Sequence, residues 1–252
     1  MRSHNSSKHL FFVSTKRNKM KKLILITRII LVVISISSCA IQKSGSIISK
    51  ERINLKERMK NFKISQCKKD SLKDFSFHCK TYRVSSDVKT AWNTYTNTNA
   101  KEAWSGPLNT FQKAYSREKD SLYLVSDSIS PMIELNTIFQ LNLRCGRILN
   151  IPVEFEITRI DEQNKTVEFS YGADNKSKGR QVLRFVDNGS ETLVMHYSYF
   201  KSDSKARDKF LYPFFHEKCM DEFHQGMIVK SEIAYDLKKN ESIENQLLTQ
   251  NK

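Results

Sequence analysis

The sequence has little glycine and proline: 252 residues contain seven Gly and four Pro. No Gly-rich phosphate-binding loop is present, and no Ser-His-Asp motif or paired-carboxylate spacing stands out, so the sequence assigns no catalytic residue by motif. No two cysteines have the CxxC spacing, which makes a zinc knuckle or a thioredoxin-like site an unfavourable interpretation. No internal repeat is visible. The chain therefore has to be interpreted from its hydrophobic periodicity and from its two ends.

The chain also lacks a dense basic stripe, although its formal net charge is +15. The first 38 residues hold eight Lys and Arg and no acid, so the net charge falls to +7 without them. The remaining basic residues are spread thinly, and many are next to Asp or Glu. Nucleic-acid binding normally needs a basic face or a known motif, and we expect none here. A mild basic excess suits a surface near anionic lipid, and it suits an ordinary soluble surface equally well.

Residues 20–38 have the pattern of an export signal. Lys21 and Lys22 are followed by an apolar run over 23–36, which Arg28 interrupts. The run is shorter than the about 20 apolar residues that span a bilayer, so it favours a removable signal peptide. Residues 1–19 do not fit in front of such a signal. We expect them to be an upstream over-call of the start codon, with Met20 as the true initiator.

The end of this segment, Ile-Ser-Ser-Cys, resembles the lipobox of bacterial lipoproteins. The resemblance implies that Cys39 is lipidated after cleavage and that its acyl chains hold the protein on a membrane. An ordinary signal peptide with an incidental cysteine is the alternative. Ala40, rather than Asp, follows Cys39. By the sorting rule of Gram-negative lipoproteins, this implies the outer membrane with the domain facing the periplasm.

After Cys39 the sequence to residue 72 is polar, and we interpret 39–72 as the lipidated cysteine and a flexible tether. A short helix that docks on the domain is the alternative for this range. Four further cysteines, Cys67, Cys79, Cys145 and Cys219, permit disulfides in an oxidising compartment. Cys67 and Cys79 are close enough in sequence to pair, and buried free thiols are the other interpretation.

The globular part is expected over 73–237, with a polar tail over 238–252. Residues 76–84 alternate and predict a strand. Ser85 or Ser86 is a suitable N-cap for the helix that follows, in which Val88, Ala91, Trp92 and Tyr95 recur at helical spacing. A second helical piece is expected near 107–115, and short strands near 122–125 and 138–143.

Residues 151–200 show the clearest pattern of the chain. Four segments alternate between apolar and polar residues and are joined by links of hairpin length, including the turn signal Asp187-Asn188-Gly189. Such a pattern predicts an antiparallel meander with one face in water and one face covered. On the covered face we expect these residues: Val153, Phe155, Ile157, Val167, Phe169 and Tyr171.

The segment LYPFFHEKCMDEFHQGM predicts the helix that covers this sheet. Pro213 stands near its start, where a missing N–H matters least. At 100° per residue, one broad side is apolar and sulfur-rich, while acids and Lys218 fall on the other side. The apolar side contains these residues: Tyr212, Phe215, His216, Cys219, Met220, Phe223 and Met227.

One strand, a helix that opens Ser-Ser-Asp-Val-x-x-x-Trp (85–92), a run of antiparallel strands and a long last helix resemble the START-like, polyketide cyclase and Bet v 1-like (SRPBCC) superfamily. The resemblance covers about 73–235. It implies an α+β helix-grip fold, in which a curved antiparallel β-sheet wraps around a long C-terminal α-helix. The Gly-rich loop of the plant-allergen branch is not evident in this sequence.

Proteins of this superfamily usually keep a hydrophobic cavity between sheet and helix. The resemblance therefore implies a cavity with the six sheet residues on one wall and Tyr212, His216, Cys219, Phe223 and Met227 on the other. A lipid or another apolar small molecule is the expected ligand. The polar groups that orient it would be Tyr212, His216, Cys219 and His196.

Other interpretations of these residues remain open. His216 is either a polar contact or general acid/base in the cavity, or a histidine bonded to backbone or solvent, and Cys219 is a small buried apolar residue. His216, Cys219 and His224 span about 140° of the helix and do not converge, so no metal site and no cofactor is expected. The alternative functions are a cyclase- or hydrolase-type enzyme using the same cavity, or an envelope structural protein whose cavity is packed shut.

Overall fold

The computed structural model describes residues 49–65, 69–145, 149–204, 208–209 and 212–250. The chain forms two compact units, 1–55 and 56–252. In the first unit, residues 49–55 are helical. The expected signal peptide and Cys39 lie outside the described residues, as does the segment proposed to precede the signal.

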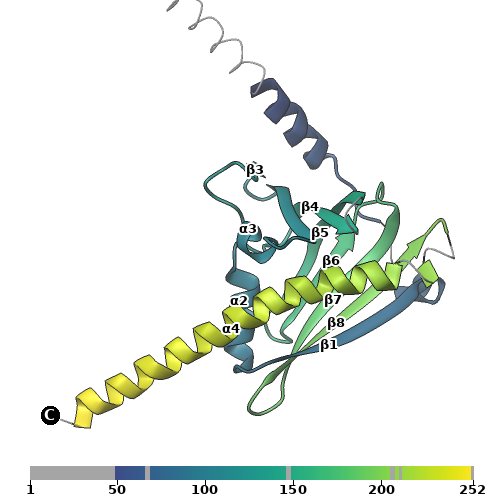
Figure 1. The fold of residues 1–252 in the computed structure, drawn as a ribbon. Helices are drawn as coiled ribbons and strands as arrows, with labels where there is room; N and C mark the ends of the chain where they lie inside the picture. Colours follow the sequence, from purple (N-terminus) through teal and green to yellow (C-terminus); the bar gives the residue numbers. More distant parts are fainter. Residues whose placement is uncertain (1–48, 66–68, 146–148, 205–207, 210–211, 251–252) are drawn as a thin grey trace, which may run out of the picture. The chain divides into compact units, whose positions relative to one another are not determined.

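The second unit contains one antiparallel sheet and a long helix that crosses one of its faces (Figure 1). The strands are paired in the order β1-β8-β7-β6-β5-β4-β2-β3. This is the helix-grip fold that the resemblance implies, and the predicted α+β class is confirmed. The elements have these bounds: η1 Lys69–Asp74, β1 Ser76–Val84, α2 Val88–Asn97, α3 Ala100–Ala103, β2 Asn109–Ser116, β3 Ser121–Leu124, β4 Thr137–Cys145, β5 Leu149–Asp161, β6 Thr166–Tyr171, β7 Ser177–Asp187, β8 Thr192–Ser202 and α4 Tyr212–Gln250.

The predicted meander corresponds to strands β5 to β8. Alternation of side chains along β5 places Phe155 and Ile157 in the core, while Glu154 faces the other way. The hairpin between β7 and β8 turns at Asp187-Asn188-Gly189, where Gly189 has φ +80° and the Asp187 side chain accepts a hydrogen bond from the Gly189 amide. Glycine adopts this backbone conformation without strain.

One secondary-structure prediction, for the segment before the meander, is wrong. Residues 107–115 were expected to be helical, but Asn109–Ser116 is strand β2. The strand contains a β-bulge, because its pairing register with β4 shifts between Phe111 and Lys113. The bulge places Phe111 and Ala114, which are three residues apart, both in the core. The short helix Ala100–Ala103 was not anticipated.

Helix α2 begins one or two residues later than expected, because Asp87, not Ser85 or Ser86, is its N-cap. The Asp87 carboxylate accepts a hydrogen bond from the Thr90 amide at 2.8 Å and another from the Thr90 hydroxyl. These bonds satisfy donors that the first helical turn leaves exposed. Helix α2 then packs its Trp92 and Tyr95 face inward, with both rings almost fully buried.

Helix α4 is longer than the sequence suggested and runs unbroken for 39 residues (Figure 1). It includes most of the segment expected to be a polar tail. The helix contacts α2, α3, β1 and β2, and its buried side chains among the described residues lie in its first half, from Cys219 to Ser231. We therefore attribute the closing of the sheet to this half.

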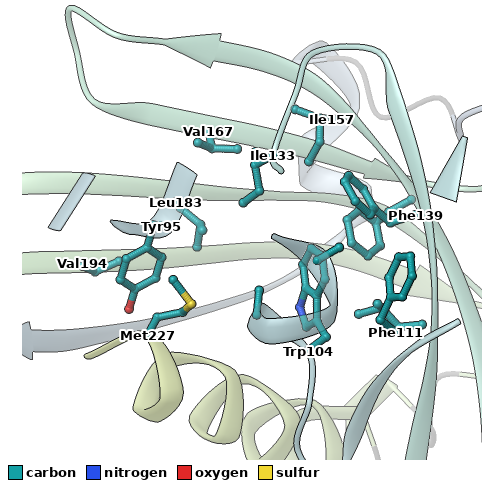
Figure 2. Packing of buried hydrophobic residues seen from close by; sticks show 14 of the residues in the cluster. Tyr95, Trp104, Phe111, Ile133, Phe139, Ile157, Val167, Leu183, Val194 and Met227 are labelled. Carbon is teal, nitrogen blue, oxygen red and sulfur yellow. The ribbon is translucent and has the colours of Figure 1, made fainter. Parts of the chain in front are cut away.

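The hydrophobic core lies between the sheet, α2, α3 and the first half of α4. In Figure 2, Tyr95 and Met227 lie together near Val194 and Leu183, while Trp104 lies near Phe139 and Phe111. The rings pack mostly edge to face or tilted, as for Tyr95 on Phe185 at 5.0 Å between centroids. Such contacts add to the free energy of apolar burial.

Residues 56–65 fall in the range interpreted as a tether, but here they pack on the sheet. Met59 is 1% exposed, and the guanidinium of Arg117 donates to the carbonyls of Lys60 and Phe62. The Ser65 amide donates to the carbonyl of Tyr171 at 2.7 Å. This part of the range follows the other interpretation, a docked segment.

Candidate functional site

A cavity of about 80 Å³ lies between the sheet and helix α4. A water molecule occupies about 30 Å³ in the liquid, and a cavity of about 150 Å³ accepts benzene. The cavity as it stands therefore has room for only a few non-hydrogen atoms. Its lining contains these residues: Trp104, Asn109, Ile133, Leu141, Leu143, Val153, Phe155, Ile157, Phe169, Tyr171, Gln181, Leu183, His196, His216, Cys219, Met220 and Phe223.

Aromatic rings form much of the apolar wall. Trp104 stacks on Phe223 with 5.7 Å between ring centroids, and Phe155 contacts both Trp104 and Phe169. These rings come from the end of α3, from α4 and from two neighbouring strands, so the wall exists only when the sheet is closed by the helices. An apolar wall of this kind favours an apolar ligand surface.

Polar side chains meet at another part of the cavity wall. Gln181 is at the centre: its Oε1 lies 2.5 Å from His196 Nε2, and its Nε2 lies 2.6 Å from His216 Nε2. The Gln181 amide also donates to the Tyr171 hydroxyl. We call this group, Tyr171, Gln181, His196 and His216, the polar cluster.

The polar cluster continues behind the cavity wall through His224. His196 Nδ1 lies 2.8 Å from His224 Nε2, and His224 Nδ1 lies 3.0 Å from the Tyr95 hydroxyl. The His224 ring is fully buried and stacks on Tyr82 at 3.9 Å between centroids. The strands β7 and β8, helix α4 and helix α2 each contribute to one connected set of hydrogen bonds.

These histidines are neutral at pH 7. Burial, and then repulsion by the other histidines, holds the pKa of His196 well below its ordinary value. Burial lowers the pKa of His216 and of His224 to about 3, with further contributions from His78 and from Lys80, respectively. A charged imidazolium would lose its hydration here without gaining a carboxylate partner.

Charged groups lie at the outer edge of the polar cluster. Lys80 on β1 forms ion pairs with Glu217 at 2.6 Å and with Asp221 at 2.8 Å on α4. The Tyr82 hydroxyl donates to Asp221 at 2.8 Å, and burial raises the Tyr82 pKa. These contacts fix α4 against the edge strand of the sheet on the side of the histidines.

A second clamp fixes α4 at the loop before β2. The Glu222 carboxylate accepts hydrogen bonds from the amides of Leu108 and Asn109 at 2.7–3.0 Å. Gly106 makes this approach possible, since a Cβ on residue 106 would lie 2.2 Å from the Glu222 carboxyl carbon. The loop amides thus fix the distance between α4 and the sheet, and the cavity lies between the two.

Most of the residues predicted to line a cavity do so here. Val153, Phe155, Ile157, Phe169, Tyr171, His216, Cys219 and Phe223 are on the cavity wall. Val167 and Met227 are buried in the hydrophobic cluster, 1% exposed each, and do not contribute to the wall. Tyr212 begins α4, and its side chain lies outside the described residues. Cys79 is an exposed free thiol, and Cys67 lies outside the described residues.

Sequence reasoning missed Gln181 and Tyr95, and it considered His224 only as a metal ligand. A signal for Gln181 exists, because it alternates in phase with Leu183 and Phe185 and so belongs to the inward face of β7. A signal for His224 also exists, because it lies four residues after Met220 and three before Met227, on the buried side of α4.

No group of three or more His, Cys, Asp or Glu within the described ranges is arranged to hold a metal ion. Across the same ranges, no helix is both long enough and apolar enough to cross a membrane.

Comparison with known proteins gives structural likenesses at low sequence identity. Norcoclaurine synthase from Thalictrum flavum, a point mutant in complex with a transition-state analogue, is 9% identical with a TM-score of 0.46, covering 65% of this chain and 96% of that one. Major latex-like protein 151 from Panax ginseng is 13% identical with a TM-score of 0.47, covering 62% and 97%. Ara h 8.0201 is 9% identical with a TM-score of 0.40, covering 63% and 95%.

No family model matches the sequence. No curated protein matches it either. The assignment of the helix-grip fold therefore rests on the strand order and on the helix that covers the sheet.

Proposed function

We propose that the domain binds a small apolar molecule in the cavity between its sheet and helix α4. The observation that carries this proposal is the composition of the cavity wall, where aromatic and aliphatic side chains surround the space and four neutral polar side chains converge at one part of it. Binding sites for small molecules typically combine an apolar wall with a few placed polar groups.

The size of the cavity favours a compact ligand. At about 80 Å³, the space holds a small ring only if side chains such as Leu143 or Met220 move slightly. A lipid is larger than such a ring, and its binding requires α4 to separate from the sheet. The ion pairs of Lys80 and the clamp of Glu222 oppose that separation.

The test is a titration of residues 40–252 with cyclopentane, a compact apolar probe. Changes in the NMR chemical shifts of the cavity side chains measure its binding. Leu143→Phe, which fills the cavity, is expected to abolish binding, while Leu237→Phe on the exposed part of α4 leaves binding unchanged. Native mass spectrometry with organic extraction would identify any ligand that co-purifies. Absence of both probe binding and a co-purified molecule would support a structural protein with a closed cavity.

We also propose that the chain is anchored to a membrane by acyl chains on Cys39, with the domain in the periplasm. The support is the Ile-Ser-Ser-Cys sequence after a charged and then apolar segment. Metabolic labelling with an alkyne fatty acid is expected to mark the wild-type chain and not Cys39→Ser. A chain that stays unlabelled, or a variant that is labelled equally, would overturn this proposal.

A further inference from the structure

The outward face of strand β8 is more apolar than the face that it turns toward the core. Its outward side chains alternate with the buried ones and are half-buried: Leu193, Met195, Tyr197 and Tyr199. The inward positions between them include the polar residues His196 and Ser198. An antiparallel strand with one face in water normally shows the reverse pattern, apolar inside and polar outside. The outward side chains of β8 therefore suit a partner that covers them.

The neighbouring strands extend this apolar surface on both sides. On β1, Phe77 is 56% exposed and packs on Tyr197 and Tyr199, with 6.3 and 5.1 Å between ring centroids. On β7, the Arg180 guanidinium lies over the Tyr199 ring, 5.3 Å from its centroid. The outward side chains of 77–83, 178–186 and 193–201 thus form one surface over three adjacent strands, which we call the outer patch.

The outer patch is positively charged, because the three segments that form it contain no Asp or Glu. Lys178 stands directly opposite Lys201 in the pairing of β7 with β8, and both side chains are exposed, as is Arg184. Among the described residues, none of these three cations forms an ion pair, whereas Arg180 pairs with Glu168. Like charges directly opposite each other destabilise a sheet, so an anionic partner would remove a repulsion at this place.

Another part of the same face of the sheet is already covered by the docked segment 56–65. Its Met59 is buried, and its Arg58 pairs at 2.9 Å with Glu154, which points outward from β5. Helix α4 crosses the opposite face (Figure 1). The outer patch therefore lies beside the docked segment, on the side of the sheet away from α4 and the cavity.

We propose that the outer patch docks on an anionic lipid bilayer. Tyrosine is favoured at the boundary between headgroups and acyl chains, where its ring is in an apolar environment and its hydroxyl is in a wet one. Lysine and arginine next to such rings are attracted to anionic headgroups. Phe77, the most exposed ring of the patch, would enter the boundary region. The proposal goes beyond the cavity and the acyl anchor, because it assigns the face of the domain that meets the membrane.

The charge of the outer patch argues against a second copy of this chain as the partner. A two-fold interface brings the same surface of both copies together. Lys178, Arg184 and Lys201 would then face the same three cations of the other copy. A bilayer with anionic headgroups presents the opposite charge to all of them.

The packing of the rings argues against single-stranded nucleic acid. Bases bind such proteins by stacking on open aromatic ring faces. Here Phe77 packs on Tyr197 and Tyr199, and Arg180 lies over Tyr199. The rings are thus neighbours of one another, and what they offer to a partner is a joint apolar surface.

The first test measures the binding of residues 40–252, which include every described residue, to vesicles by co-sedimentation. Phosphatidylglycerol vesicles supply the anionic surface and phosphatidylcholine vesicles the neutral one. Each Lys or Arg near an anionic surface strengthens binding about fivefold at low salt. The three cations without an ion pair therefore predict about a hundredfold preference for the anionic vesicles, and this preference should decrease as salt is added.

A pair of matched variants shows whether the outer patch is the surface that binds. Lys178→Gln with Lys201→Gln removes two of its charges and is expected to weaken binding to anionic vesicles about 25-fold. Lys89→Gln with Lys239→Gln removes two charges from exposed positions on α2 and α4 and is expected to weaken it by about twofold at most. Both variants have the same net charge. Equal losses would mean that net charge alone causes the binding, which would overturn the proposal.

A second pair tests the apolar contribution. Phe77 and Leu237 are 56% and 60% exposed, so neither substitution removes a core residue. Phe77→Ser is expected to weaken binding to anionic vesicles about tenfold, because its ring no longer leaves water on docking. Leu237→Ser is expected to leave binding unchanged. Unchanged binding by Phe77→Ser would contradict the assigned face.

The outcomes separate this inference from the two proposals above. If the wild-type fragment does not bind anionic vesicles, or binds neutral ones equally well, the docking surface is wrong, while the cavity and the lipidation of Cys39 are decided by their own tests. A single-stranded oligonucleotide serves as the competing partner in the same assay. If it binds more tightly than the vesicles, and Lys178→Gln with Lys201→Gln removes that binding, the partner is nucleic acid and the proposal is overturned.

Discussion

The two halves of helix α4 have different surroundings, although they belong to one unbroken helix. In the first half, Cys219, Met220, His224, Met227 and Ser231 are all buried against the sheet or α2. In the second half, Ile233, Leu237, Ile243 and Leu248 are between 47% and 60% exposed. A helix within a protein usually owes most of its stability to packing of one face, and among the described side chains of α4 the buried ones are all in the first half.

The comparison shows that the composition of a buried helix face depends on what the face meets. The first half carries His216, His224 and Ser231 at buried or half-buried positions, where a simple core would have leucine. Two of these residues meet polar partners from β7, β8 and α2. The described leucine and isoleucine side chains of the second half are exposed, so they are not part of the hydrophobic core.

The largest difference between the halves is expected at low pH, because only the first half contains histidines. His196, His216 and His224 have lowered pKa values in the fold, so between pH 6.5 and about 3 the unfolded chain binds protons that the folded chain does not. The free energy of unfolding is thus at its full value above pH 6.5 and decreases as the pH falls. From pH 7 to 5 the loss is about 2 kcal/mol for each of His216 and His224, and His196 changes the free energy of unfolding in the same direction.

Urea unfolding at pH 9, 7 and 5 measures this dependence. We expect equal midpoints at pH 9 and 7 and a much lower midpoint at pH 5, with Lys80 and His78 adding repulsion to the protonated rings. A midpoint that stays constant from pH 7 to 5 would show that the histidines are accessible to water and would contradict their described burial.

A large-to-small substitution in each half sharpens the comparison. Met227 is 1% exposed and Leu237 is 60% exposed. Met227→Ala is expected to lower the free energy of unfolding by about 3 kcal/mol, because it leaves a cavity between α4 and the sheet. Leu237→Ala is expected to change it by less than about 0.5 kcal/mol. Chemical denaturation measures both, and equal losses would mean that the second half is packed.

The sheet and the buried half of α4 were predictable because their patterns are local. Alternation over 151–200 identified the inward face of β5, and the hairpin turn fixed the register of β7 on β8. That register pairs Leu183 with His196 and Gln181 with Ser198, so Gln181 and His196 are diagonal neighbours on the inward face. Half of the polar cluster was therefore contained in the sequence, given the turn.

The contact between the two residues behind the cluster, Tyr95 and His224, could not be predicted from local patterns. Tyr95 and His224 are 129 residues apart, and their contact depends on how α2 and α4 cross over the sheet. The error at β2 has a similar origin, since its bulge between Phe111 and Lys113 belongs to its pairing with β4. A pattern that reports only one element cannot show where another element will lie against it.

A carboxylate in each half provides a smaller test. Glu222 accepts hydrogen bonds from two loop amides, whereas Glu241 is exposed on the second half. Glu222→Ala is expected to cost about 2 kcal/mol, because it leaves the amides of Leu108 and Asn109 without their charged acceptor. Thermal and urea unfolding should show no measurable change for Glu241→Ala. If Glu222→Ala left the free energy of unfolding unchanged, water would be replacing the carboxylate as the acceptor for the loop amides.

The smallest effect is expected from removing the end of the second half. A chain that stops after Lys239 loses about 11 residues of helix but keeps every residue of α4 that the structure describes as buried, and it keeps the 3.5 Å ion pair between Lys238 and Asp87. Its Tm is expected to stay within about 2 °C of the full-length value. Far-UV circular dichroism should show the loss of helix at the same time. A helical signal that falls while the Tm is constant would establish that the first half alone closes the sheet, whereas a Tm that falls by several degrees would show that the exposed isoleucines and leucines stabilise the domain.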